Sequence, residues 1–323
     1  NDFMNLRLGT GEVPSSATVT VPHSSLSLKE DEYDKTPQEL AEKYHMVSDA
    51  PIVSEFLKYG NCGLVGKRED TIAMARSMII QVASLHSYEE VKIIGLYPEN
   101  EQEMWDWMRW LPHCTDDGHN GRFVASNVSE SAPVLDVWKK VLDRRKEQKE
   151  NLMYQQKVLP LPYLLFVVAD SKLIMDTPIG NYLQMNQPAL GMGAIILSES
   201  VSEFPHSVQN IVELYGTIGR IYQRERSNEK VSFIPEYAPQ ELKVLDTYAR
   251  KMAPIRLRGG KGDQGLPSML TFLDGLHIKN VEQLEIGDYW LNCSPERSLA
   301  VPIGVRSNGK PFYFNIHEKG HGP

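Results

Sequence analysis

The sequence has few cysteines and no long apolar run. Its 323 residues include Cys62, Cys114 and Cys293, which lie far apart and are odd in number. This usage excludes a disulfide-stabilised secreted scaffold and predicts reduced thiols in a cytosolic environment. No apolar stretch approaches the roughly 20 residues of a membrane-spanning helix, and no signal-peptide pattern is visible. Because the chain starts at Asn1 without Met and ends abruptly at Pro323, we expect it to be a piece of a longer polypeptide.

The chain also has fewer positively charged residues than negatively charged ones. Lys and Arg number 34 against 42 Asp and Glu, which gives a net charge of −8. An acidic chain binds polyanions poorly unless its basic residues cluster. The densest basic run, residues 139–149, is interleaved with Asp143 and Glu147, and this pattern predicts a solvated helix face. We therefore expect no nucleic-acid partner.

Internal repeats and low-complexity segments are missing as well, and the centre of the chain alternates strand and helix patterns. Continuous apolar runs such as residues 164–168 are typical of a parallel sheet that is buried on both faces. Their alternation with helices predicts an α/β fold with a doubly wound, mostly parallel sheet. The predicted strands are residues 63–66, 91–96, 122–125, 163–169, 194–197 and 211–214, and the predicted helices are residues 69–86, 101–110, 132–151 and 178–184.

The two ends of the chain have a different character. Residues 1–22 alternate apolar and polar types around Gly9-Thr10-Gly11, which predicts a hairpin turned at the glycines. We predict three parts: an N-terminal hairpin and loop (1–35), the α/β domain (36–235), and a linker with strands that forms a small C-terminal α+β extension (236–323). Further predicted features are a loop at 24–35, a helix start at Thr36-Pro37, a helix at 239–251, a loop at 258–263, short elements at 268–272 and 281–284, and a C-terminal hairpin turned at Asn308-Gly309.

The most informative stretch is residues 63–81, where a short apolar strand enters a glycine turn and leaves in an amphipathic helix. This arrangement is typical of the phosphate-binding loop of nucleotide-binding α/β proteins. Such a loop needs glycines whose backbone N–H groups surround phosphate, a lysine for the β- and γ-phosphates, and Ser or Thr for Mg²⁺. If Lys67 is the loop lysine, Asn61 replaces the first glycine and Arg68 replaces the hydroxyl residue. A register set by the helix puts Thr71 near the lysine position and Ile72 at the hydroxyl position instead.

Either register lacks a required group, so we predict a degenerate phosphate loop. The candidate cofactor-binding residues at this turn are Gly66, Lys67 and Arg68, because a helix N-terminus attracts anions. Glu69 and Asp70 follow in the first helical turn, where they complement the helix dipole and would repel phosphate. We expect these positions to be non-functional, and we identify no catalytic and no metal-binding residue.

A fourth candidate position is Asp170, at the end of the predicted strand 163–169. Phosphate-loop ATPases carry one or two carboxylates at such a strand end, where they hold Mg²⁺ and orient water. Ser171 and Lys172 follow Asp170, however, and no Glu stands beside it as a general base. A carboxylate that caps the next turn is therefore an equally good interpretation.

Two further clusters have simple structural explanations. His113, Cys114 and His119, with Asp116 and Asp117 nearby, are metal-ligand residue types, but zinc sites use tighter, paired spacing, so a polar loop is favoured. The second cluster comprises Met104, Trp105, Trp107, Met108 and Trp110. It predicts core packing, with a partner-facing patch as the alternative. All of these residues except Trp105 are expected to face the sheet.

Several ordered segments resemble one family. They are residues 63–66, 75–77, 81–87 and 91–93, Trp110-Leu111-Pro112-His113 with Asp116-Asp117, the strand ending in Asp170, and residues 191–197, 291–292, 299–304 and 320–323. Their order and spacing resemble a cytosolic module of type VII secretion ATPases, the EssC/EccC-like members of the FtsK/SpoIIIE group, over nearly the whole chain. In that family the last segment leads into an intact Walker A loop. The resemblance therefore places this chain just before the first intact phosphate loop.

The resemblance implies a degenerate P-loop, RecA-like fold and a membrane-anchored parent protein. That parent would carry forkhead-associated domains and transmembrane helices upstream, and three more ATPase modules downstream. It would export small WXG-type proteins from the cytoplasmic face of the bacterial cell membrane. The implied partners are the adjacent ATPase domains of the same chain, the membrane components of the secretion system and the secreted WXG-type proteins. ATP and Mg²⁺ would bind in the downstream domains, and no cofactor is expected in this part.

Three hypotheses follow. The first is a catalytically silent structural module that couples a membrane anchor to active motors. The second is a nucleotide-binding regulatory ATPase domain that uses Lys67 or Arg68 in an atypical way. The third is a DNA translocase module, which rests on kinship with chromosome-pumping motors and is disfavoured by the net charge of −8.

Overall fold

The computed structural model describes residues 2–17, 20, 36–115, 121–151, 159–174, 177–239, 241–257, 271–275, 278, 280–284, 286–292, 294, 299–305 and 311–315. All structural statements concern this part of the chain. By contacts the chain forms two units, Asn1–Pro254 and Ile255–Pro323. The three-part division predicted from the sequence stays a prediction.

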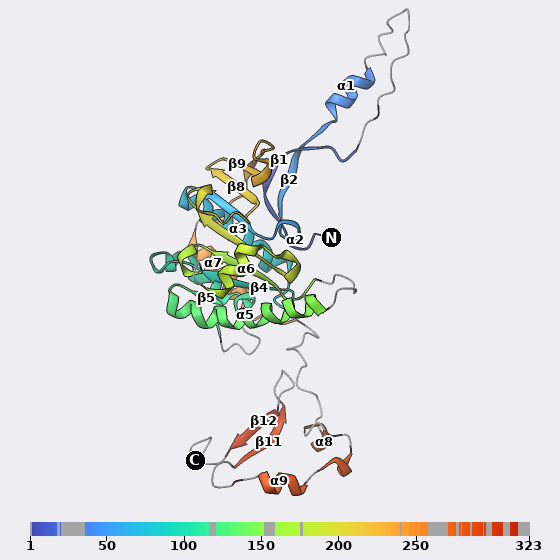
Figure 1. Cartoon of the computed structure of the whole chain (residues 1–323), viewed down its shortest axis with the longest axis vertical. Coiled ribbons are helices and arrows are strands. Elements are labelled where there is room, and N and C mark those ends of the chain that lie inside the picture. Colours follow the sequence, from blue (N-terminus) through green and yellow to red (C-terminus); the bar gives the residue numbers. More distant parts are fainter. Residues whose placement is uncertain are drawn as a thin grey trace, which may run out of the picture. The chain divides into compact units, whose positions relative to one another are not determined.

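The described residues of the first unit form ten strands in one sheet. They are β1 (Asn5–Pro14), β2 (Met46–Glu55), β3 (Cys62–Gly66), β4 (Val91–Leu96), β5 (Val124–Ala125), β6 (Tyr163–Val168), β7 (Met192–Ser198), β8 (Asn210–Tyr215), β9 (Ile218–Gln223) and β10 (Val231–Pro235). The strand order is β2-β1-β10-β9-β8-β3-β7-β6-β4-β5. In Figure 1, β1, β2, β8 and β9 lie toward one end of this sheet, and β4 and β5 lie toward the other. Strands β8 to β5 in this order are parallel, and β9, β10, β1 and β2 extend the sheet antiparallel.

The parallel part of the sheet confirms the predicted α/β fold class. All six strands predicted from apolar runs are present, and they are the six parallel ones. Strand β3, which leads into the candidate phosphate loop, lies between β7 and β8 near the middle of the sheet. Strand β6, which leads into Asp170, is separated from β3 by β7. The sheet therefore brings the two candidate segments to the same carboxyl edge, one strand apart.

Helices cover both faces of the parallel strands. The helices of this unit are α1 (Thr36–Lys43), α2 (Phe56–Tyr59), α3 (Arg68–Leu85), α4 (Gln102–Trp105), α5 (Val128–Asn151), α6 (Pro178–Met185) and α7 (Leu242–Met252). Successive side chains of a strand point to opposite faces of the sheet. Ile93 and Ile94 of β4 therefore belong to two separate apolar clusters, one on each face. Helices α3 and α7 contribute to the first cluster, and α5 and α6 contribute to the second. Within the described residues, no helix is both long enough and apolar enough to cross a membrane.

Helix α5 begins four residues before the predicted start at residue 132. The side-chain oxygen of Asn127 accepts the N–H of Glu130 at 3.0 Å, as an N-terminal cap does. Pro133 therefore lies inside the helix rather than at its first position.

The hairpin predicted at Gly9-Thr10-Gly11 is wrong. Residues Asn5–Pro14 form one continuous strand, β1, which pairs with β2 on one side and with β10 on the other. A Cβ atom at Gly9 would collide with the carbonyl oxygen of Ile234, and one at Gly11 would lie 2.7 Å from the carbonyl oxygen of Ser232. The glycines therefore permit close approach of β10 and do not mark a turn.

The predicted helix 101–110 is broken into shorter pieces. A 3₁₀ turn (Glu99–Glu101) precedes α4, and a second 3₁₀ segment (Asp106–Trp110) follows it. Trp105, Trp107 and Met108 are buried, which confirms their predicted core packing. Met104 is 41% exposed, so its predicted orientation toward the sheet is wrong. The reason is that 3₁₀ segments, with three residues per turn, change which side chains share a face.

The described residues of the second unit form short elements. Strands β11 (Ala300–Val305) and β12 (Pro311–Asn315) pair antiparallel, which confirms the predicted C-terminal hairpin. Its turn at Asn308-Gly309 and the predicted loop 258–263 lie outside the described residues, as does the loop 24–35 of the first unit. Two short helices, α8 (Phe272–Gly275) and α9 (Ile286–Asn292), complete the unit together with a 3₁₀ turn at Val281–Gln283.

Candidate phosphate-loop site

The junction between β3 and α3 is too short to form a phosphate cradle. Strand β3 ends at Gly66 and α3 begins at Arg68, so Lys67 alone separates the two elements. Gly66 adopts φ +148°, a conformation that favours glycine, and a Cβ atom there would collide with the carbonyl oxygen of Leu214. A phosphate loop needs several consecutive residues whose N–H groups curl around the anion. The turn at Gly66 packs closely against strand β8 instead.

The backbone contacts of Lys67 serve the start of helix α3. Lys67 caps α3 in an extended conformation, its carbonyl accepts the N–H of Thr71 at 3.1 Å, and its side chain is exposed. The Thr71 hydroxyl donates to the carbonyl of Arg68 at 2.9 Å. That hydroxyl, which the alternative register puts near the lysine position, therefore serves the first turn of the helix.

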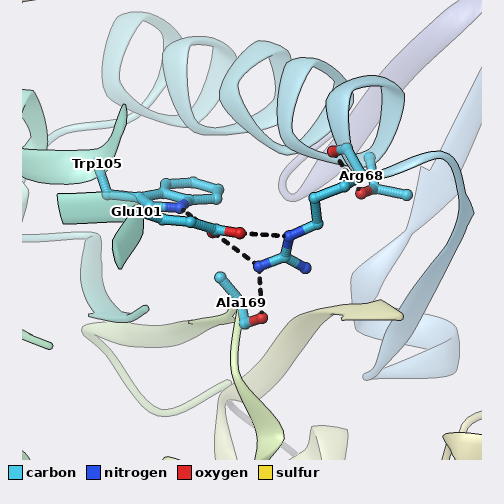
Figure 2. A network of polar contacts seen from close by, with 5 residues as sticks. Arg68, Glu101, Trp105 and Ala169 are labelled. Atoms are coloured by element: carbon cyan, nitrogen blue, oxygen red, sulfur yellow. Dashed lines mark hydrogen bonds and ion pairs between the residues drawn. The ribbon is translucent and has the colours of Figure 1, made fainter. Parts of the chain in front are cut away.

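Arg68, which replaces the hydroxyl residue in the register that makes Lys67 the loop lysine, is engaged in an ion pair (Figure 2). Its Nε and Nη2 atoms donate to the two carboxylate oxygens of Glu101, each at 2.7 Å. Nη2 also donates to the carbonyl oxygen of Ala169 at 2.8 Å. The guanidinium group thus connects the start of α3 to the end of β6. A forked arginine–carboxylate pair is among the stronger polar contacts in proteins.

The Glu101 carboxylate is nearly enclosed, with 12% of the side chain exposed against 29% for Arg68. It also accepts the indole N–H of Trp105 at 3.1 Å. Trp105 is fully buried and stacks on Tyr97, with ring centroids 6.3 Å apart. The carboxylate is therefore held by three donors, and the ion pair is anchored in the core.

The acidic residues of the first helical turn have separate roles. The Asp70 carboxylate accepts the backbone N–H of Gly216 at 3.0 Å, and the Tyr237 hydroxyl donates to the carbonyl of the same glycine at 2.7 Å. These bonds hold the turn between β8 and β9 against the N-terminus of α3. Glu69 is exposed.

Asp170 caps a turn in this structure. Its Oδ1 atom accepts the backbone N–H of Lys172 at 3.0 Å, at the start of a 3₁₀ turn (Ser171–Leu173). This is the alternative that the sequence left open beside the metal role. Gly66, Lys67, Arg68 and Asp170 all lie at the carboxyl edge of the parallel strands, but Arg68 bonds to Ala169 and not to Asp170.

The residues that sequence reasoning missed are Glu101, Trp105 as a hydrogen-bond donor, and the Ala169 carbonyl. No spacing rule connects Arg68 to a carboxylate 33 positions away. The only available signal was the arginine at a hydroxyl position, which calls for a nearby acidic partner when it is partly buried. As a whole, the site offers an internally neutralised ion pair, and its residues do not fit a triphosphate with Mg²⁺.

Two residues of the candidate metal cluster, His113 and Cys114, are buried. The His113 side chain is 1% exposed, and its Nε2 atom lies 2.9 Å from the carbonyl oxygen of His86. Cys114 is fully buried. Residues 116–120, which include Asp116, Asp117 and His119, lie outside the described residues. Within the described ranges, no three His, Cys, Asp or Glu side chains are grouped as metal ligands would be.

Burial of His113 predicts a pH-dependent stability. Loss of solvation, together with the positive charge of Lys92, lowers the pKa of His113 from 6.5 to about 4. The unfolded chain therefore binds a proton between pH 6.5 and 4 that the folded chain does not. Stability contributed by the neutral imidazole is complete above pH 6.5 and falls as the pH drops to 4, by up to about 3 kcal/mol.

Denaturant unfolding at several pH values measures this contribution. His113→Gln should flatten the loss of stability between pH 6.5 and 4, whereas His206→Gln, at an exposed histidine, should leave it unchanged. Identical slopes for wild type and His113→Gln would rule out the assigned origin.

The fold and the junction define an α/β domain in which a parallel strand leads through a one-residue turn into a helix, with an arginine–glutamate ion pair beside the turn. No family model matches the chain. The ESX secretion system protein EccC of Geobacillus thermodenitrificans is 28% identical over 332 residues, covering 100% of this chain and 21% of that protein. The type VII secretion system protein EssC of Staphylococcus aureus is 27% identical over 325 residues, covering 100% and 22%.

Solved structures agree on the fold. ATPases 2 and 3 of EssC from Geobacillus thermodenitrificans superpose with a TM-score of 0.51 at 12% identity, covering 98% of this chain and 59% of that one. The cytoplasmic domain of EssC gives a TM-score of 0.50 at 12% identity, covering 97% and 59%. The recognition of the sequence as EssC/EccC-like is therefore confirmed. The chain spans about a fifth of the length of these relatives, and its place just before an intact phosphate loop stays a prediction.

Proposed function

We propose that this chain is a catalytically silent structural module of a type VII secretion ATPase. One observation carries the proposal. The Arg68 guanidinium is paired with Glu101 and bonded to the strand end at Ala169. In the register that makes Lys67 the loop lysine, this is the position where a phosphate loop presents a hydroxyl to Mg²⁺. A cation in that place disfavours Mg²⁺, and a carboxylate beside it disfavours phosphate. The module keeps the architecture of a motor domain without its chemistry.

The wider role rests on the relatives. Similarity to EccC and EssC over the whole of this chain supports membership in a longer secretion ATPase. In this proposal the module connects a membrane anchor to downstream ATPase domains of the same polypeptide at the cytoplasmic face of the cell membrane. Those domains would bind ATP and Mg²⁺, and the whole protein would contact the other membrane components and export WXG-type proteins.

The intact protein tests this role through Lys67. Because Lys67 is exposed and contacts no phosphate in the proposed role, Lys67→Ala should leave both ATP hydrolysis and protein export within about twofold of wild type. Glu101→Ala, which breaks the ion pair, should reduce export. Loss of hydrolysis on changing Lys67 alone would contradict a silent module.

A nucleotide-binding regulatory domain is the second candidate. The observation in its favour is the exposed Lys67 at the N-terminus of the 18-residue helix α3, where the helix dipole attracts anions. In that case Lys67→Ala should abolish nucleotide binding to this chain.

A further inference from the structure

A trough lies at the far end of the parallel strands from the phosphate-loop site. Its volume is about 710 Å³, within the range of ligand sites. It is lined by helix α5 on one side and by the segments that precede β5 and β6 on the other. Neither these segments nor α5 contributes to the junction at Arg68, so the trough is independent of the proposed function.

One wall of the trough is an apolar helix face. Val134, Val137 and Trp138 of α5 line it, and Leu161 faces it from the segment before β6. Val137 is 49% exposed and Leu161 is 56% exposed, so apolar surface is open to solvent. The lining residues of α5 extend from Pro133 to Gln148, which at 1.5 Å per residue is about 22 Å. That length suits a helical peptide of about 15 residues better than a small molecule.

The charge of the trough has one sign. Four cations line it, among them Arg122, Arg144 and Arg145, and no carboxylate does so within the described part of the chain. Arg145 is buried and donates to the carbonyls of Leu190, Gly191 and Pro162. Arg122 and Arg144 are exposed, and each donates to a backbone carbonyl. In a chain of net charge −8, this is a local positive site beside an apolar surface.

A buried donor also lines the trough. Trp138 is 6% exposed, and its indole N–H has no hydrogen-bond partner among the described residues. Burial, with the charge of Arg144 as a second cause, lowers the pKa of Arg145 to about 10. A ligand that brings negative charge beside Arg144 and Arg145 would offset the repulsion between these two cations.

We propose that the trough binds an acidic amphipathic helix of a partner protein. Apolar side chains of that helix lie against Val137, Trp138 and Leu161, and its carboxylates pair with Arg144 and Arg122. The pattern is that of a helix in a groove, with apolar anchors for affinity and charge for orientation and specificity.

A designed peptide pair tests the proposal. The probe is a fluorescein-labelled 18-residue helix of Leu, Ala and Glu with Leu on one face, and its twin has Lys at every Glu position. Fluorescence anisotropy should show saturable binding of the Glu peptide and at least tenfold weaker binding of the Lys twin. Arg144→Glu and Val137→Asp should each weaken the Glu peptide at least tenfold.

Lys146→Glu is the matched control, because Lys146 is exposed on the same helix and does not line the trough; it should change the dissociation constant less than threefold. Thermal melts establish that each variant is folded. Equal binding of the two peptides, equal losses in Arg144→Glu and Lys146→Glu, or no saturable binding would overturn the proposal. So would Arg144-dependent binding to phosphatidylglycerol vesicles without peptide binding, or a dimer that Val137→Asp dissociates and the peptide leaves intact.

Discussion

Trp105→Ala should lower the free energy of unfolding of the first unit by about 3–5 kcal/mol, the range for removing a buried aromatic side chain. Trp105 is fully buried, stacks on Tyr97 and donates its indole N–H to Glu101. Its removal leaves a cavity and also deprives the Glu101 carboxylate of one of its three donors. Urea denaturation followed by circular dichroism measures the change.

Trp290→Ala is the matched control for this substitution. Trp290 is 79% exposed and belongs to the second unit, so its replacement should leave the unfolding of the first unit within about 0.5 kcal/mol of wild type. A loss below about 1 kcal/mol in Trp105→Ala would show that the indole does not anchor the site.

Glu101→Ala should destabilise the first unit by about 2–3 kcal/mol. The substitution leaves the Arg68 guanidinium, 29% exposed, and the buried indole N–H of Trp105 without their carboxylate. Loss of one partner from a fully buried pair costs more, but partial exposure of Arg68 lets water replace some of the lost interaction. Equilibrium denaturation measures this loss as well.

A double-mutant cycle separates the pair from the rest of the contacts. Arg68→Ala, Glu101→Ala and the double substitution should give a coupling energy of at least about 1 kcal/mol. The surface pair of Arg250 and Asp246, four residues apart on α7 with side chains 53% and 42% exposed, is the control and should give about 0.3–0.5 kcal/mol. Equal coupling in the two cycles would mean that the Arg68–Glu101 pair adds nothing beyond a surface contact.

Much of the fold could be predicted because its parallel strands are buried on both faces. Such strands are continuous apolar runs, and Tyr163–Val168 is a clear case, with every residue buried. Strand β1 was misread because Gly9 and Gly11 are typical of turns in sequence. Their real role, close approach to β10, depends on a partner strand more than 200 residues away.

The candidate site was predicted in part for the same reason. Gly66 ends a recognisable strand and Arg68 follows it, so their position was clear from the sequence. The partner of Arg68 was not, because Glu101 comes from the segment after β4, and a tertiary contact brings it to the end of β6. Residue spacing in the sequence predicts contacts within one helix or strand. The contacts of Arg68 instead join the start of α3, the segment after β4 and the end of β6.

Calorimetric titration of the chain with ATP and Mg²⁺ tests most directly the proposal that the Arg68–Glu101 pair takes the place of a nucleotide site at this junction. In the proposed role, the titration should give no saturable heat up to millimolar nucleotide and no release of phosphate. Saturable binding at micromolar concentration that Lys67→Ala abolishes, or measurable turnover by this chain alone, would contradict it.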